Sequence, residues 1–92
     1  GNALFRKKER PQNLILTLSS KDPEVESKQL VAVVQEHCTS ASIKRIDVNE
    51  SQLEASFIIS LEDPEQLMNM EQALKKNHPE LSYTFLDTEG AL

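Results

Sequence analysis

The feature that most constrains the fold of this chain is an internal repeat. Residues 16–37, LTLSSKDPEVESKQLVAVVQEH, align with residues 57–78, FIISLEDPEQLMNMEQALKKNH, at a constant offset of 41 positions. Each copy begins with apolar residues at alternate positions and continues with apolar residues at helical spacing, a succession typical of a strand followed by a helix. The chain therefore contains two similar strand–helix halves.

The triplet Asp-Pro-Glu occurs at the same place in both copies, at residues 22–24 and 63–65. An Asp side chain accepts hydrogen bonds from the free N–H groups at a helix start, and Pro suits the first helical position because it has no N–H to leave unpaired. In the second copy Gln66 can complete a capping box. We therefore predict that helices begin near residues 23 and 64, with Asp22 and Asp63 as their N-caps.

Apolar residues follow both triplets at spacings of three and four, which predicts one apolar stripe on each helix. These residues are Leu30, Val33 and Val34 in the first helix and Leu67, Met70 and Leu74 in the second. Because the residue before a proline avoids helical geometry, Pro79 should end the second helix near residue 77 or 78. The first helix should end between residues 37 and 39.

Alternation with a period of two predicts the strands. The residues that share a face are Leu14, Leu16 and Leu18 in one strand, Leu53, Ala55, Phe57, Ile59 and Leu61 in another, and Leu81, Tyr83 and Phe85 in a third. Ile46 and Val48 indicate a shorter strand between the first helix and the second of these runs. Residues 49–51, Asn-Glu-Ser, supply the turn of a hairpin.

The predicted order is β-α-β-β-α-β, which indicates an α+β, ferredoxin-like fold. We expect a four-stranded antiparallel sheet of order 4-1-3-2 with two helices on one face, and the first and third strands running parallel at its centre. The domain should span residues 13–87. Residues 1–12 would form a juxtamembrane linker with a tag remnant, and residues 88–92 a C-terminal tail.

The sheet face without helices should carry the residues that alternate with the core positions. Isoleucines near its centre and hydroxyl-bearing side chains around them suggest self-association, as apolar surface patches often mark contacts. The proposed contact residues are Ile15, Thr17, Ile58 and Leu86. A solvated sheet face is the alternative. We expect a homodimer formed by sheet-face packing or by pairing of edge strands.

The charge distribution argues against nucleic acid as a partner. The chain has a formal net charge of -5, although residues 6–10 read RKKER directly behind Leu4 and Phe5. Outside this segment the chain is acidic and poor in aromatic residues, whereas phosphate binding requires a broad basic surface. The basic segment is interpreted either as a cytoplasmic juxtamembrane segment or as a solvated linker.

Residues for catalysis, cofactor binding and metal binding are not evident. Glycine occurs only at positions 1 and 90, so no glycine-rich phosphate loop is present. Adjacent helical residues point in different directions, so Cys38 and His37 do not form a nucleophile pair. His37 and His78 are interpreted as residues at helix C-termini, with a metal site as the weaker alternative. We expect a chain that is not an enzyme.

Several segments together resemble ACT-like C-terminal cytosolic domains of small polytopic bacterial membrane proteins, including the MgtC family of magnesium-transport accessory proteins. The resemblance lies in RKKER, LILTLSS, the Asp-Pro-led helix, IKRIDVNESQLEASFIISLED and SYTFLD. It implies a non-catalytic regulatory or self-association domain on the cytoplasmic face of the bacterial inner membrane, attached to a transmembrane region. The alternative is a sensor of amino acids or divalent ions. ACT domains commonly have glycine in the effector loop, but SSKDPEVES lacks it, so the resemblance assigns no ligand residues here.

Overall fold

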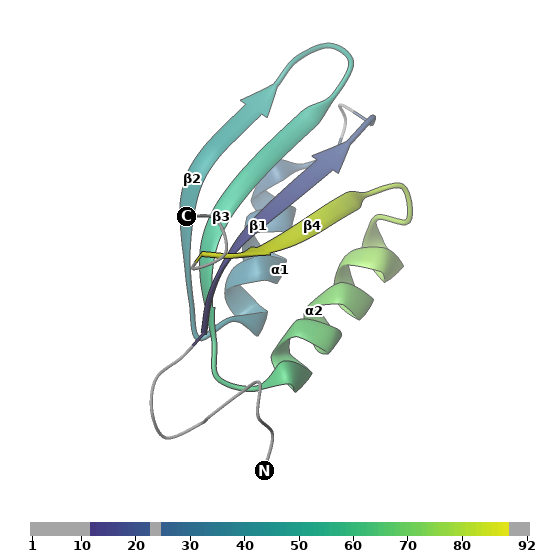
Figure 1. The fold of residues 1–92 in the computed structure, drawn as a ribbon. Coiled ribbons are helices and arrows are strands. Elements are labelled where there is room, and N and C mark those ends of the chain that lie inside the picture. Colours follow the sequence, from purple (N-terminus) through teal and green to yellow (C-terminus); the bar gives the residue numbers. More distant parts are fainter. Residues whose placement is uncertain (1–11, 23–24, 89–92) are drawn as a thin grey trace.

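A computed structural model describes residues 12–22 and 25–88 of the chain (Figure 1). The elements are β1 (Gln12–Ser20), α1 (Ser27–His37), β2 (Ser40–Val48), β3 (Leu53–Leu61), α2 (Pro64–Asn77) and β4 (Ser82–Asp87). Their order is the predicted succession β-α-β-β-α-β. The chain therefore has an α+β fold.

The four strands form one sheet with the order β2-β3-β1-β4, and every neighbouring pair is antiparallel. Read from the β4 edge, this is the predicted order 4-1-3-2. Both helices lie on the same side of the sheet, which leaves the other side open (Figure 1). This architecture is compatible with a ferredoxin-like fold.

The prediction that the first and third strands run parallel was wrong. β1 and β3 pair antiparallel, with Ile15 opposite Ile58 near the middle of the ladder. α1 returns the chain to the starting end of the sheet, so β2 runs in the same direction as β1. The β2–β3 hairpin then reverses the chain once more, which makes β3 antiparallel to β1.

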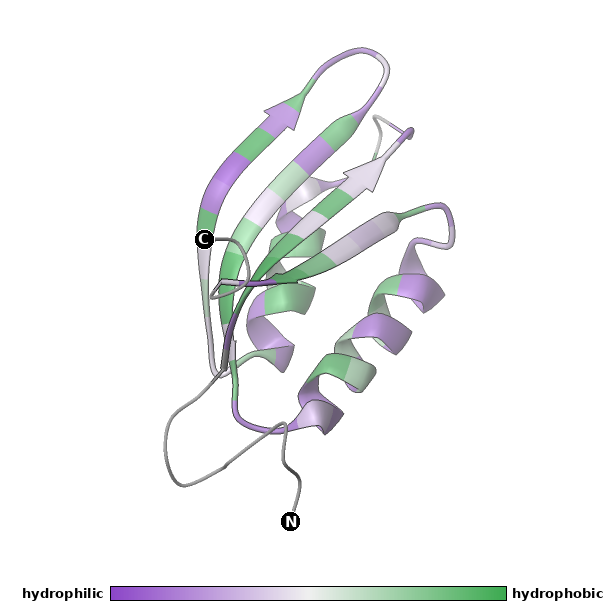
Figure 2. Ribbon diagram, viewed as in Figure 1, coloured by the Kyte–Doolittle hydropathy of each residue, from purple (hydrophilic) through white to green (hydrophobic). Residues whose placement is uncertain are grey.

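The hydrophobic core lies between the sheet and the two helices. Figure 2 shows apolar segments on the helix surfaces that face the sheet. The buried apolar residues are Leu14, Leu16, Leu18, Leu30, Val34, Leu53, Ala55, Phe57, Ile59, Leu61, Met70, Leu74 and Leu81. Every one belongs to the apolar positions predicted from period-two or helical spacing. Burying each large side chain contributes about 1.5 to 3 kcal/mol of transfer free energy.

The start of α2 confirms Asp63 as an N-cap. Its side-chain Oδ1 accepts a hydrogen bond of 2.9 Å from the backbone N–H of Glu65. Gln66 Oε1 accepts in return from the backbone N–H of Asp63 at 3.1 Å, which completes the predicted capping box. The helix begins at Pro64 and ends at Asn77, both within the predicted limits.

The start of α1 contradicts Asp22 as an N-cap. The helix begins at Ser27, and its N-cap is Glu26, whose side chain makes no capping hydrogen bond. Asp22 instead belongs to a turn in which its carbonyl accepts from the N–H of Val25 at 3.3 Å. The repeat explains the difference, since Val25 aligns with Gln66 and has no polar group to complete a capping box. The rest of the first triplet, residues 23–24, lies outside the described residues.

β2 is longer than the short strand predicted from Ile46 and Val48. It has nine residues, and its register with β3 shifts between Ile43 and Arg45, which leaves Lys44 as the extra residue of a β-bulge. Because of the bulge, Ile43 and Ile46 point to the same side of the sheet at a spacing of three residues instead of two. The period-two pattern is therefore interrupted, and the sequence pattern revealed only the part of the strand after the bulge.

Candidate association surfaces

The open face of the sheet carries one apolar row. Ile15 lies opposite Ile58 of β3 on one side and opposite Leu86 of β4 on the other, and Ser42 of β2 continues the row beyond Ile58. Ile15 and Ile58 are half-buried by their neighbours, whereas Leu86 is 50% exposed. The structure thus brings together three of the four residues proposed from the sequence for self-association.

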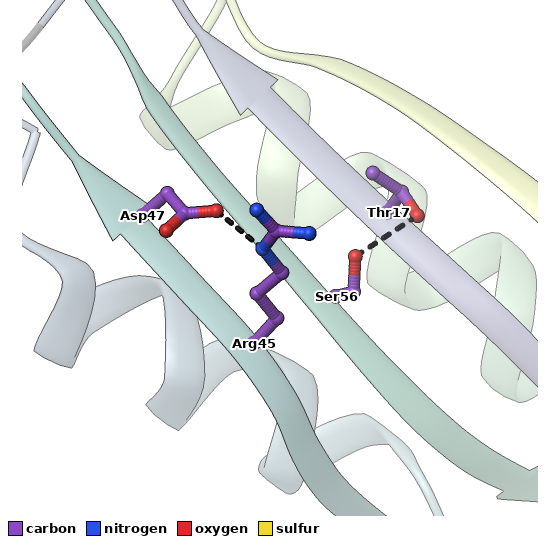
Figure 3. A network of polar contacts seen from close by, with 4 residues as sticks. All are labelled: Thr17, Arg45, Asp47 and Ser56. Carbon is purple, nitrogen blue, oxygen red and sulfur yellow. Dashed lines mark hydrogen bonds and ion pairs between the residues drawn. The ribbon is translucent and has the colours of Figure 1, made fainter.

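The fourth residue, Thr17, lies in a polar row beside them. Thr17 Oγ1 and Ser56 Oγ are hydrogen-bonded at 3.3 Å across β1 and β3 (Figure 3). On the other side of the apolar row, Ser60 Oγ donates to Asn13 Oδ1 at 2.6 Å. Because polar pairs that satisfy one another flank the isoleucines on both sides, the apolar surface of the open face is narrow.

A second apolar surface lies on the helix side of β2. Ile43, Ile46 and Val48 are 47%, 38% and 55% exposed. Each is opposite a fully or nearly fully buried residue of β3, namely Phe57, Ala55 and Leu53 respectively. The exposed residues therefore point to the core side of the sheet, but the helix layer does not extend far enough to cover them. Figure 2 shows the apolar segments along β2.

This surface was missed from the sequence, although part of the pattern was visible. Ile46 and Val48 were assigned to a strand, and the predicted order 4-1-3-2 places that strand at an edge of the sheet. What the sequence did not indicate was how far the two helices reach across the sheet. Burial of the β2 residues depends on this reach rather than on their own spacing.

The outer edge of β2 pairs with no strand among residues 12–22 and 25–88. After the bulge at Lys44, the ladder with β3 is regular from Arg45 to Val48. Arg45 Nε donates to Asp47 Oδ2 on the open side of the sheet, where the two side chains are 71% and 51% exposed (Figure 3). An edge strand of this kind offers backbone groups, apolar side chains and charges of both signs to a partner.

His37 and Cys38 take part in local packing at the end of α1. His37 Nδ1 is hydrogen-bonded to the carbonyl of Val33 at 2.8 Å, one turn earlier in the same helix. Cys38 Sγ donates to Met70 Sδ at 3.9 Å, and burial raises the pKa of the thiol to about 11. A thiol with so high a pKa is a poor nucleophile at neutral pH.

His78 is the C-cap residue of α2, in agreement with its predicted place at a helix end. Its backbone N–H donates to the carbonyl of Leu74 at 2.8 Å, and its Nε2 is buried without a hydrogen-bond partner. In the part of the chain that the structure describes, no group of three or more His, Cys, Asp or Glu residues is placed to hold a metal ion.

No protein-family model matches the chain, and no curated protein matches it in sequence. Solved structures do resemble it. A de novo designed protein, Foldit4, has a TM-score of 0.60 and 13% sequence identity, with 85% of this chain and 96% of the designed chain covered. The design shares the fold alone.

A natural protein with a similar part is the YXEP protein of Bacillus subtilis, a dinuclear metal-binding peptidase of the M20 family. It matches with a TM-score of 0.58 and 14% identity over 85% of this chain. This chain corresponds to 26% of that peptidase chain. At this identity the likeness again concerns the fold.

The described helices α1 and α2 are too short and too polar to cross a lipid bilayer. The predicted juxtamembrane segment, residues 1–12, falls almost wholly outside the described residues, which begin at Gln12.

Proposed function

We propose that this chain is a non-catalytic self-association domain of ferredoxin-like, ACT-like type, which regulates the protein to which it belongs. The observation that carries the proposal is the position of the exposed apolar side chains. Within the described residues five large apolar side chains are exposed, and four of them lie on the edge strands β2 and β4. The four are Ile43, Ile46, Val48 and Leu86.

Exposed apolar side chains on an edge strand favour association, because the unpaired backbone edge and the apolar surface then lie on the same strand. An edge strand has unpaired backbone N–H and C=O groups, and removing a contiguous apolar surface from water lowers the free energy. Natural edge strands are usually short or carry charged side chains, whereas β2 has nine residues and exposes Ile43, Ile46 and Val48 beside its charges. A second copy of the chain is the proposed partner, because in a homodimer each copy covers the edge strand of the other.

The setting proposed for this domain is the cytoplasmic face of a bacterial inner membrane, in a protein similar to the MgtC family. The support for this part is the resemblance of the sequence, in which the basic residues 6–10 precede the first strand. Linker residues span at most about 3.3 to 3.6 Å each, so the nine residues from Leu4 to Gln12 would hold the domain near the bilayer. Association of two domains would then change the distance between their membrane segments.

Sedimentation velocity over a concentration series tests the proposal. We expect the wild-type domain to form a species of twice 10.4 kDa at micromolar concentrations. A single species of monomer mass up to high micromolar concentration would contradict self-association. Thermal shift against amino acids and divalent cations is the companion experiment. A specific ligand raises the melting temperature increasingly as its concentration exceeds its Kd, and such a rise would favour the sensor instead.

A further inference from the structure

We propose that two copies of the chain pair through β2, antiparallel and about a two-fold axis at Ile46, so that their sheets join into one sheet of eight strands. This inference rests on the proposed function and names its partner and contact. It assigns the contact to the free edge of β2 rather than to the open face of the sheet.

The geometry of a symmetric strand pair restricts the possible registers. Two identical antiparallel edge strands are related by a two-fold axis perpendicular to the sheet, which leaves the helices of both copies on the same side. Residues directly opposite each other across the pair point to the same side of the sheet. Since neighbouring residues of β2 point to opposite sides, the axis must pass beside one residue, which then faces its own copy.

Charge selects the residue at the axis within the regular stretch of β2. An axis at Arg45 would place arginine opposite arginine, and an axis at Asp47 would place aspartate opposite aspartate; both arrangements are destabilising. An axis at Val48 would place Ile46 opposite the partner's Glu50. Only the axis at Ile46 places Arg45 opposite the partner's Asp47, and symmetry provides this pair twice.

The same axis also joins the uncovered apolar surfaces. Ile46 would face the partner's Ile46 on the helix side of the sheet, where each is 38% exposed in the single chain. Val48 would lie opposite the partner's Lys44, whose methylene groups can cover it. The bulge at Lys44 ends the regular ladder, so pairing stays limited to residues 44–48.

The overall charge of the chain also favours contact at this strand. The net charge is -5, so two copies repel each other over most of their surface. β2, by contrast, contains two basic residues, Lys44 and Arg45, and one acidic residue, Asp47. Two β2 strands therefore approach with less electrostatic repulsion than the acidic surface elsewhere would impose.

Disulfide trapping tests the position of the axis. In a Cys38→Ser background, which removes the native thiol, Ile46→Cys should form a covalent dimer rapidly under mild oxidation. Ile43→Cys is the matched control, since Ile43 is on the same side of the same strand and is comparably exposed. Its two copies would be six residues out of register, about 20 Å apart, and should not cross-link. Equal trapping at both positions would overturn the proposed register.

Charge exchange between two different copies tests the ion pairs. Arg45→Asp makes β2 acidic and Asp47→Arg makes it basic, so each variant alone should dimerise roughly tenfold more weakly than wild type. Mixing the two variants should restore the dimer, because both opposed pairs become Asp–Arg again. Both variants lack the Arg45–Asp47 ion pair within the chain, and mixing does not restore it. Recovery of the dimer on mixing therefore reports the contact between copies.

The open-face variant Ile58→Asp separates this inference from the proposed function. We expect Ile58→Asp to keep the wild-type dimerisation constant, with circular dichroism confirming that it is folded. A wild-type dimer that neither traps at position 46 nor recovers on mixing would overturn pairing through β2 and leave self-association standing. A wild-type domain that stays monomeric would overturn both.

Discussion

The phenol of Tyr83 on β4 donates a hydrogen bond of 2.9 Å to Glu71 Oε2 on α2. This bond ties the last strand to the second helix beside the core, where Tyr83 and Phe85 also meet edge to face at 5.7 Å between ring centroids. Burial and the hydrogen bond to Glu71 together raise the pKa of Tyr83 above its ordinary value of 10.0. Folding therefore favours the neutral phenol.

Tyr83→Phe should lower the free energy of unfolding by about 0.5 to 1 kcal/mol at neutral pH, because it removes the hydrogen bond while keeping the ring. Urea unfolding measures the difference. Since the pKa is raised in the folded state, the contribution of the phenol is complete below about pH 10, the pKa of an unfolded tyrosine, and declines as the pH rises through the folded pKa. Wild type should therefore lose its advantage over Tyr83→Phe in this alkaline range. A constant difference across this range would contradict the assigned pKa direction.

The two helix starts should respond differently to substitution. Asp63→Ala removes the capping bond to Glu65 and should lower the free energy of unfolding by about 1 kcal/mol. Glu26 makes no capping hydrogen bond through its side chain, and Glu26→Ser introduces a side chain that can make one. This substitution should raise the free energy of unfolding by up to about 1 kcal/mol. Chemical denaturation of both variants measures these changes. Equal losses in the two variants would show that α1 is already capped by Glu26.

The same helix starts show how far the sequence predicts the fold. Asp63 was identified correctly because the residue three positions later, Gln66, completes its capping box. Asp22 was predicted wrongly as an N-cap. The two copies share Asp-Pro-Glu, but the first copy has Val25 at the position where the second has Gln66. The succession of elements and the core positions followed from periodicity, which depends on many residues and tolerates single exceptions, whereas the strand order followed from the topology of the predicted fold.

Cys38 should react slowly with thiol reagents in the folded domain. Its pKa of about 11 against 9.0 for a free thiol implies a thiolate population lower by about 100-fold at neutral pH. Reaction with Ellman's reagent should accordingly be much slower in the native state than in urea, where the thiol is solvated. Met70→Ala offers a control, since removing the neighbouring thioether should expose Cys38 and speed the reaction. Equal native and denatured rates would contradict the burial of the thiol.

One substitution in β2 and one in β3 should separate the effect on association from the effect on stability. Ile46→Thr alters a partly exposed residue and should change the free energy of unfolding of the monomer by less than about 1 kcal/mol, while weakening dimerisation. Ile59→Thr, on the same side of the sheet but fully buried, should cost about 2 to 4 kcal/mol. Unfolding at low protein concentration and sedimentation at high concentration measure the two effects. A similar loss of stability in both variants would show that the helices cover β2.

The association surface was less predictable than the fold. Ile15, Ile58 and Leu86 share one row, as alternation within strands and the strand order require. The exposed residues of β2 could not be found in this way, because their alternation marks them as core residues and the helices that should cover them stop short. Which surface remains open depends on the width of the helix layer, and this property is not encoded in the pattern of any one strand.

A series of two-dimensional amide NMR spectra at increasing protein concentration tests the central claim most directly. We expect the cross-peaks of residues 45–48 to shift or broaden as the domain dimerises, while those of Ile15 and Ile58 stay in place. Spectra that remain superimposable from low to high micromolar concentration would contradict association of this domain through β2.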